Sequence, residues 1–164
     1  MYKYCEMQTD IFGTIYILTE ETELLDISLS EDDWGKASKK YDAAFAPDDA
    51  VLVEIKSELE EYFKGDRKTF SFPIKLNGTV FQEKVWNELL NIPYGETRCY
   101  ADIANAIDNP KAVRAVGQAN RKNPIPIVVP CHRVIGKDKS LTGYTGTRTD
   151  LKEKLLELEG VLNG

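Results

Sequence analysis

The spacing of apolar residues changes at Asn77-Gly78, and this change limits the fold more strongly than any other feature of the chain. Before it lie three short runs rich in Ile, Leu, Tyr and Thr, the composition of strands between turns, at residues 2–7, 13–19 and 23–29. After it, apolar residues recur three and four positions apart, as on one face of a helix. We therefore predict an α/β amino-terminal domain over residues 1–77 and a mainly helical carboxy-terminal domain over residues 78–164.

In the first domain the three strands are expected to form an antiparallel meander, because only short turns separate them. Apolar residues at helical spacing predict a helix over residues 50–63, which begins after Asp49 and ends at Gly65. Residues 69–76 have the composition of a further strand. The polar segment 30–49 carries no other prediction.

In the second domain we expect helices over residues 79–92, 100–107, 111–121 and 150–158. Pro110 is predicted in the first turn of the third helix, where a missing N–H group costs little. The inner stripe of that helix is expected to be Ala112, Ala115, Val116 and Ala119, and its outer face to carry Arg114, Gln118 and Arg121. Two short helices with a polar outer face on the second are typical of a helix-turn-helix, but any packed helix pair gives the same pattern.

One segment carries an obvious nucleophile. The only histidine of the chain, His132, directly follows Cys131. A thiol beside an imidazole is the basic arrangement of a reactive cysteine, because the thiolate is the nucleophile and a neighbouring base or cation raises its population. The apolar run 125–129 before it predicts a buried strand that Pro130 ends. A buried structural cysteine beside a surface histidine remains the simpler alternative.

The net charge of −6 is unevenly distributed. The segment 98–148, around the Cys-His pair, has nine Lys and Arg against three Asp and Glu. Such a local positive charge suits a polyanion such as DNA, although a solvated surface of mixed charge would explain it as well.

The remaining composition excludes several classes of protein. Three cysteines without CxxC spacing and a single histidine cannot complete a usual zinc site, so we expect no metal. No stretch approaches the roughly 20 apolar residues of a membrane span. The amino terminus lacks the apolar core of a signal peptide, so a cytoplasmic protein without membrane contact is expected.

Several ordered motifs of residues 78–160 together resemble the O6-alkylguanine-DNA alkyltransferases, the methylated-DNA–protein-cysteine methyltransferases of direct DNA repair. The motifs are Gly78-Thr79-Val80-Phe81-Gln82, Val85-Trp86, Ile92-Pro93-Tyr94-Gly95-Glu96-Thr97, Arg114-Ala115-Val116-Gly117, Asn123-Pro124, Pro130-Cys131-His132-Arg133-Val134 and the segment 141–146. The first 75 residues match only in size and element order. The resemblance implies a ribonuclease-H-like sheet in the first domain and a winged-helix-like helix-turn-helix in the second.

The resemblance also implies a reaction. Cys131 would accept the alkyl group of O6-alkylguanine, and of O4-alkylthymine, in a single irreversible turnover without a cofactor. His132 would take the thiol proton through a water molecule, Glu159 would orient His132, and Asn123 would brace the turn of the site. From the residues alone, Glu159 is an ordinary carboxylate at a helix end and Asn123 a turn former before proline.

The implied partner is double-stranded DNA, bound in the minor groove without sequence specificity by a monomer. Tyr100 would help to rotate the damaged nucleotide out of the duplex, and Arg114 would fill the space that it leaves. Further contacts to DNA or to the flipped base would come from Ala115, Gly117, Gln118, Arg121, Arg133, Val134, Tyr144, Thr145 and Gly146. Lys152 matches a family lysine near the site, but an ordinary place on the helix surface explains it equally well.

Three departures from the family pattern are Cys99, Thr147 and Leu158, and none of them removes a proposed catalytic group. Three other functions compete with alkyl transfer. A non-catalytic damage-binding relative would lack the nucleophile that Cys131 provides. A cysteine hydrolase would need an oxyanion hole, for which the sequence gives no separate signal. A transcription factor would leave the Cys-His pair unexplained.

Overall fold

The computed structural model describes residues 1–136 and 149–161, and the chain forms two compact units, Met1–Lys75 and Leu76–Gly164. Each unit is described by itself. The described residues include no helix that is both long and apolar enough to cross a membrane.

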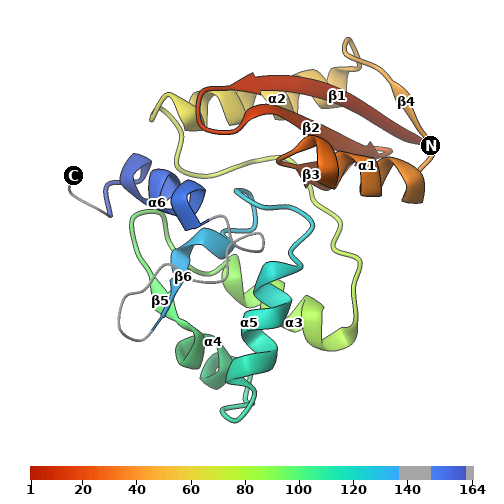
Figure 1. The fold of residues 1–164 in the computed structure, drawn as a ribbon. Helices are drawn as coiled ribbons and strands as arrows, with labels where there is room; N and C mark the ends of the chain where they lie inside the picture. Colours follow the sequence, from red (N-terminus) through yellow and green to blue (C-terminus); the bar gives the residue numbers. More distant parts are fainter. Residues whose placement is uncertain (137–148, 162–164) are drawn as a thin grey trace. The chain divides into compact units, whose positions relative to one another are not determined.

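The first unit contains a four-stranded sheet (Figure 1). Its strands are β1 (Tyr2–Thr9), β2 (Gly13–Glu20), β3 (Glu23–Ser28) and β4 (Ala43–Phe45), in the order β3-β2-β1-β4. The pairs β1/β2 and β2/β3 are antiparallel, which confirms the predicted meander, and β4 joins the free edge of β1 in parallel.

Two helices cover opposite faces of this sheet, as the alternation of side chains along a strand requires. On one face, Cys5 lies near α2 (Ala50–Phe63), which turns Leu52, Ile55 and Leu59 into the core. On the other face, Trp34 of α1 (Glu31–Lys40) stacks on Tyr16 of β2. The helix predicted over 50–63 has these same bounds, and the Asp49 side chain caps it by accepting from two backbone N–H groups.

Two predictions for this unit differ from the structure. The polar segment 30–49 contains α1 and β4. The spacing of apolar residues could not reveal α1, because this helix buries only Ala37. The Ser30 side chain caps the helix by accepting from the Asp33 N–H group. Residues 69–76 do not form a strand. They contact the sheet through one isolated bridge, Leu24 to Ile74, beside Pro73, which lacks an N–H group for a continuous ladder.

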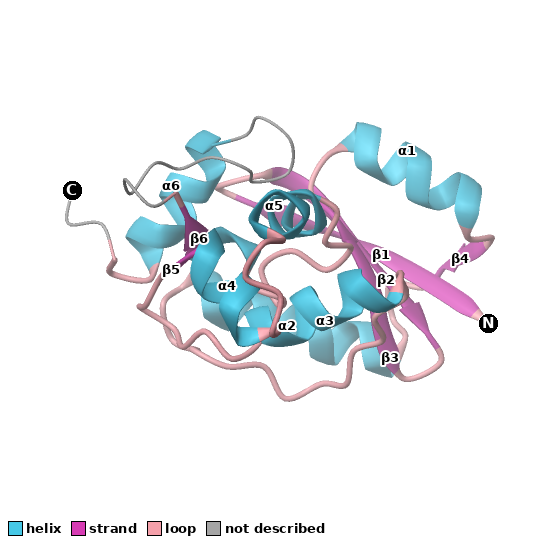
Figure 2. Ribbon diagram, turned by 90° about the horizontal axis from the view of Figure 1, so that it is seen from below, coloured by secondary structure: helices cyan, strands magenta, loops and turns pink. Residues whose placement is uncertain are grey.

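The second unit is mainly helical (Figure 2). It contains α3 (Val80–Leu89), α4 (Tyr100–Ala106), α5 (Val113–Arg121), α6 (Thr149–Leu158) and the 3-10 helix η1 (Cys131–Arg133), with β5 (Arg98–Cys99) parallel to β6 (Val134–Ile135). Helices α3, α4 and α5 pack on one another. The buried Trp86 indole of α3 fixes this packing by donating to the Ala119 carbonyl of α5 at 2.8 Å.

Helices α4 and α5 form the predicted helix-turn-helix pair, with two differences in detail. Helix α5 begins at Val113 rather than at residue 111, so Pro110 lies in the preceding turn and not in the first helical turn. Val116 and Ala119 are buried as expected, whereas Ala115 is exposed on the outer face. The inner stripe is instead continued by a polar residue, Asn120, four positions after Val116.

Candidate active site

The segment before Cys131 is buried but irregular, so the prediction of a strand over 125–129 is wrong. The Asn123 side chain takes the place of a strand partner: its Oδ1 accepts from the Ile125 N–H at 3.0 Å, and its Nδ2 donates to the Val129 carbonyl at 2.8 Å. A hydrogen bond from the Val129 N–H group to the Ile125 carbonyl closes the turn. Three prolines in 124–130 remove donors that a ladder would need, which favours this side-chain brace.

This brace delivers Cys131 at the first position of η1, where the cysteine exposes only 1% of its surface. Its N–H group donates to the Val129 carbonyl, and its carbonyl accepts from the Asn120 amide of α5 at 3.3 Å. Burial raises the pKa of the Cys131 thiol to about 11, although Asn123 and Lys152 oppose the rise. At neutral pH the resting side chain is therefore a thiol, and a base is needed to form the nucleophile.

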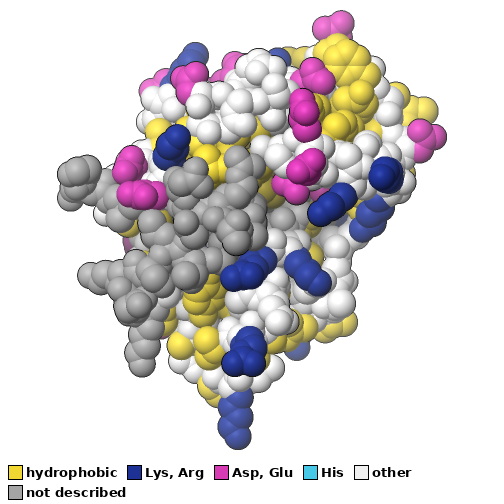
Figure 3. Space-filling model, viewed as in Figure 1, with side chains coloured by type: hydrophobic (Ala, Val, Ile, Leu, Met, Phe, Trp, Pro, Cys, Tyr) yellow, Lys and Arg dark blue, Asp and Glu magenta, His cyan; other side chains and the backbone are white. Residues whose placement is uncertain are grey.

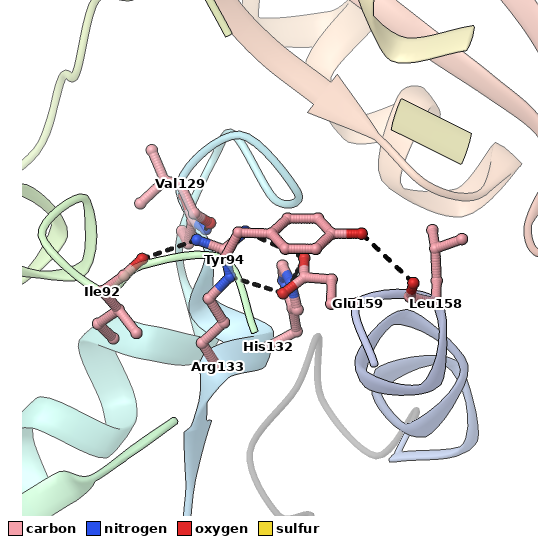
Figure 4. A network of polar contacts seen from close by, with 8 residues as sticks. Ile92, Tyr94, Val129, His132, Arg133, Leu158 and Glu159 are labelled. Carbon is pink, nitrogen blue, oxygen red and sulfur yellow. Dashed lines mark hydrogen bonds and ion pairs between the residues drawn. The ribbon is translucent and has the colours of Figure 1, made fainter. Parts of the chain in front are cut away.

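An imidazole lies next in the chain. His132 is fully buried, and its Nε2 lies 2.7 Å from Oε2 of Glu159 (Figure 4). Burial would raise the pKa of Glu159, but hydrogen bonds and charges from His132 and Arg133 outweigh it and hold that pKa at about 2. An ionised carboxylate can only accept, so Nε2 must carry the proton. The lone pair of a neutral imidazole is then on Nδ1, which has no hydrogen-bond partner among the described residues.

Arg133 does not have the free guanidinium that a phosphate contact needs. Its residue exposure is 7%, and its Nε and Nη2 donate to the two Glu159 oxygens at 2.8 and 3.0 Å. Its Nη1 donates to the Ile92 carbonyl at 2.7 Å, and its guanidinium lies 5.6 Å from the centre of the Tyr94 ring (Figure 4). The expectation that Arg133 contacts DNA is therefore corrected, because all three of these guanidinium nitrogens donate to groups inside the protein.

Lys152 is also inside, not on the helix surface. Its side chain on α6 is fully buried, and its ammonium donates to the carbonyl of Val134 and lies 6.0 Å from the centre of the Tyr100 ring. Burial lowers the pKa of Lys152 to about 8, although the neighbouring Cys131 opposes the shift. Val134, predicted at the pocket wall, is fully buried at the start of β6.

The outer face of α5 carries the residues expected to meet DNA. Arg114, Ala115, Gln118 and Arg121 are all exposed, and Lys and Arg side chains are visible over α5 in Figure 3. Gly117 lies against Tyr100: a Cβ at this glycine would be 3.9 Å from the tyrosine ring. Ala115 thus presents only a methyl group on the exposed face beside Arg114, whereas Gly117 is half-buried. Tyr144, Thr145 and Gly146 lie outside the described residues.

Two parts of this arrangement were missed by the sequence analysis. Asn120 carried a signal, because a polar residue on the buried stripe of a helix needs a partner, and here that partner is the Cys131 carbonyl. Tyr94, whose hydroxyl donates to the Leu158 carbonyl at 3.3 Å and whose ring faces Arg133, gave none beyond its place in a family motif. Over residues 1–136 and 149–161, no group of three or more His, Cys, Asp or Glu side chains is placed to hold a metal ion.

Comparison with known proteins gives a consistent result for both units. The family model of the 6-O-methylguanine DNA methyltransferase DNA-binding domain matches residues 80–161, and that of the ribonuclease-like domain of the same proteins matches residues 2–76. The chain belongs to the 6-O-methylguanine DNA methyltransferase family. The constitutive methylated-DNA–protein-cysteine methyltransferase of Bacillus subtilis is 50% identical over 149 residues, 91% of this chain and 90% of its own length.

Solved structures of the 6-O-methylguanine DNA methyltransferase family share the same fold. The O6-methylguanine methyltransferase of Mycobacterium tuberculosis superposes with a TM-score of 0.87 at 38% identity, covering 100% of this chain and 96% of its own. A structure of the M. tuberculosis protein in complex with DNA gives a TM-score of 0.86 at 39% identity, covering 96% and 92%. The two-domain fold class predicted from the sequence is thereby confirmed.

Proposed function

We propose that the chain repairs alkylated DNA directly by moving the alkyl group from O6 of guanine to Sγ of its own Cys131. The observation that carries the proposal is the order of three buried groups: a thiol, an imidazole with an unengaged Nδ1, and a carboxylate on the opposite ring nitrogen. This is the sequence of nucleophile, base and orienting group that covalent catalysis requires. O4-alkylthymine, which offers the same alkyl–oxygen bond, is a second proposed substrate.

In the proposed reaction His132 takes the thiol proton through a water molecule as Sγ attacks the alkyl carbon. The Sγ–carbon bond forms while the carbon–O6 bond breaks, and the electron pair leaves on the guanine. The proton held by His132 passes to the leaving guanine, directly or with the Tyr100 hydroxyl giving its own proton and being reprotonated in turn, so that an unmodified guanine remains in the DNA. The product thioether has no leaving group that water could displace readily. Each molecule is therefore expected to act once, without a cofactor.

The positive charge of Lys152 supports the same step. Its ammonium lies near Cys131 and is held by the Val134 carbonyl, so it favours the thiolate form over the thiol. Asn123 and Asn120 fix the backbone on each side of the nucleophile through the Val129 and Cys131 carbonyls. A sulfur held in this way can react only with an alkyl carbon brought to it in one orientation.

The substrate base is stacked inside duplex DNA and must be extruded before it can reach Cys131. We propose that α5 lies in the minor groove, where its small residues Ala115 and Gly117 permit close approach. Arg114 would enter the base stack and Tyr100 would help to turn the nucleotide, while Gln118, Arg121 and the pocket residues Tyr144, Thr145 and Gly146 complete the contacts. None of these roles requires a particular base sequence, and a cytoplasmic monomer acting alone suffices.

The decisive experiment incubates the protein with duplex DNA that contains O6-methylguanine and measures intact and peptide masses. The expected result is a gain of one methyl group per molecule, located on Cys131, after which no further transfer occurs however much DNA is added. A methyl group on another residue would contradict the assignment of the nucleophile. Repeated turnover by one protein molecule would contradict the suicide reaction.

Replacement of Arg114 by alanine is expected to slow transfer from duplex DNA by about tenfold or more at saturating DNA, because unstacking a base costs a few kcal/mol that the side chain helps to offset. Transfer from free O6-methylguanine base should be unchanged, since nothing has to be extruded. Both rates are measured in single-turnover assays.

Arg121, exposed on the same helix, provides the matched control. Its replacement by alanine should weaken the binding of methylated and unmethylated duplex equally, as loss of a phosphate contact does, and leave the saturated rate unchanged. Equal slowing of duplex and free base by Arg114→Ala would contradict the extrusion role.

A further inference from the structure

The Glu159 carboxylate accepts hydrogen bonds from two residues, His132, whose imidazole can gain a proton, and Arg133, whose guanidinium is a cation. Its Oε2 accepts from His132 Nε2 at 2.7 Å and from Arg133 Nη2 at 3.0 Å, and its Oε1 accepts from Arg133 Nε at 2.8 Å. All three residues are buried. A buried carboxylate that faced the imidazole without Arg133 would draw a proton onto the ring, because a nearby opposite charge favours the ionised form.

Several contacts fix the Arg133 guanidinium beside the negative charge of Glu159. The guanidinium is a delocalised cation that meets the carboxylate with two parallel N–H groups, which is the fork geometry of a strong pair. Its remaining arm is fixed by the Ile92 carbonyl at 2.7 Å, and the Tyr94 ring covers it at 5.6 Å (Figure 4). These contacts come from the segment after α3, so the position of the cation does not depend on His132 itself.

We infer that Arg133 is a positioning residue for the base of the proposed function: by cancelling the charge of Glu159, it keeps His132 neutral while the carboxylate still fixes the ring. The carboxylate then orients the imidazole without stabilising its protonated form. The lone pair on Nδ1 stays available for the thiol proton over the whole neutral range. This inference rests on the proposed function for its purpose, but the charge balance that it describes exists without DNA.

Of the other charged groups around His132, Lys152 acts in the same direction as Arg133 and Glu159 acts in the opposite direction. Burial is the largest cause that lowers the pKa of His132; Glu159 opposes it, and Arg133 and Lys152 add to it by like-charge repulsion. The neighbouring Cys131 is a neutral thiol at pH 7. Glu159 is therefore the group whose charge would favour protonation of the ring, and Arg133 is the cation in direct contact with that carboxylate.

The single histidine of the chain makes the test direct, because every imidazole signal in an NMR spectrum belongs to His132. We would titrate the ring nitrogens in the native protein, in Arg133→Gln and in the double variant Arg133→Gln, Glu159→Gln, all without DNA. The native ring should stay neutral, protonated on Nε2, to below pH 6.5. In Arg133→Gln its pKa should rise by about one unit or more, and in the double variant the rise should disappear.

Tyr94→Phe is the matched control, because it removes a hydroxyl from the same network without changing any charge, and it should leave the His132 pKa unchanged. An unchanged His132 pKa in Arg133→Gln would overturn the inference, as would a native ring that titrates above pH 6.5. Should the neutral variants fail to fold, Arg133→Lys is titrated instead; it retains the charge, and a rise of one unit or more in this variant would also overturn the inference.

The pH dependence of methyl transfer then separates this role from a purely structural one. Arg133→Gln should transfer slowly at neutral pH and recover as the pH passes the raised His132 pKa, whereas a structural defect would lower the rate equally at all pH values. The proposed function is tested by whether methyl reaches Cys131 in the native protein. Its failure would leave the NMR result unaffected, so the two failures can be told apart.

Discussion

Replacing Cys131 with alanine is expected to abolish alkyl transfer completely while leaving the binding of methylated duplex DNA largely intact. The thiol is the only group of the site that forms a bond to the alkyl carbon in the proposed reaction, and no other side chain can substitute for it. The residues expected to hold DNA lie on α5, and their placement does not depend on the sulfur. Peptide mass spectrometry and a mobility-shift titration measure the two properties separately.

Cys99 provides the control, since it is a second, partly exposed thiol of the same unit. Cys99→Ser replaces the thiol with a hydroxyl, a preferred side chain at the N-cap of α4, and should transfer methyl at the native rate. If Cys131→Ala retained transfer, or if Cys99→Ser abolished it, the nucleophile would have been assigned wrongly. If Cys131→Ala loses both its structure and DNA binding, Cys131→Ser is tested in its place. This variant should fold and remain inactive, because a hydroxyl is a far weaker nucleophile than a thiolate.

The parts of the fold that local chemistry decides were predictable from the sequence. The strands of the meander are bounded by turn residues, and α2 has a capping aspartate before it and a glycine after it, so its bounds were predicted to the residue. Helix α1 and β4 were missed because their stability depends on contacts with distant residues. Trp34 of α1 packs on Tyr16, and β4 exists only as a partner of β1.

The candidate site shows the same limit. Cys131 and His132 are adjacent, so their meeting required no structure, and Glu159 followed from the family motif. The sequence could not show that the Asn123 side chain forms hydrogen bonds with the backbone before Cys131 in place of a neighbouring strand. It also could not show that Arg133 points inward to a carboxylate 26 residues away. A basic residue in a positive segment suits DNA by charge alone. Its burial, which removes it from the DNA surface, follows only from long-range packing.

Replacing His132 with asparagine is expected to lower the transfer rate at pH 7 by about 10²- to 10⁴-fold, the usual contribution of a general base. The native rate should change little between pH 6.5 and 7.5, because burial lowers the pKa of His132 and the ring is already neutral there. The variant has to rely on thiolate formed without a base. With a thiol pKa of about 11, that fraction is small and grows tenfold for each unit of pH.

The variant's rate should therefore rise about tenfold per pH unit between pH 6.5 and 7.5, where the native rate is nearly constant. This range lies below the Lys152 pKa of about 8, so most Lys152 side chains keep their charge in both profiles. Rapid-quench single-turnover assays at saturating methylated duplex give both profiles, and duplex affinity shows whether the fold is retained. A variant whose rate is low but independent of pH would mean that His132 supports the structure of the site and takes no proton from Cys131.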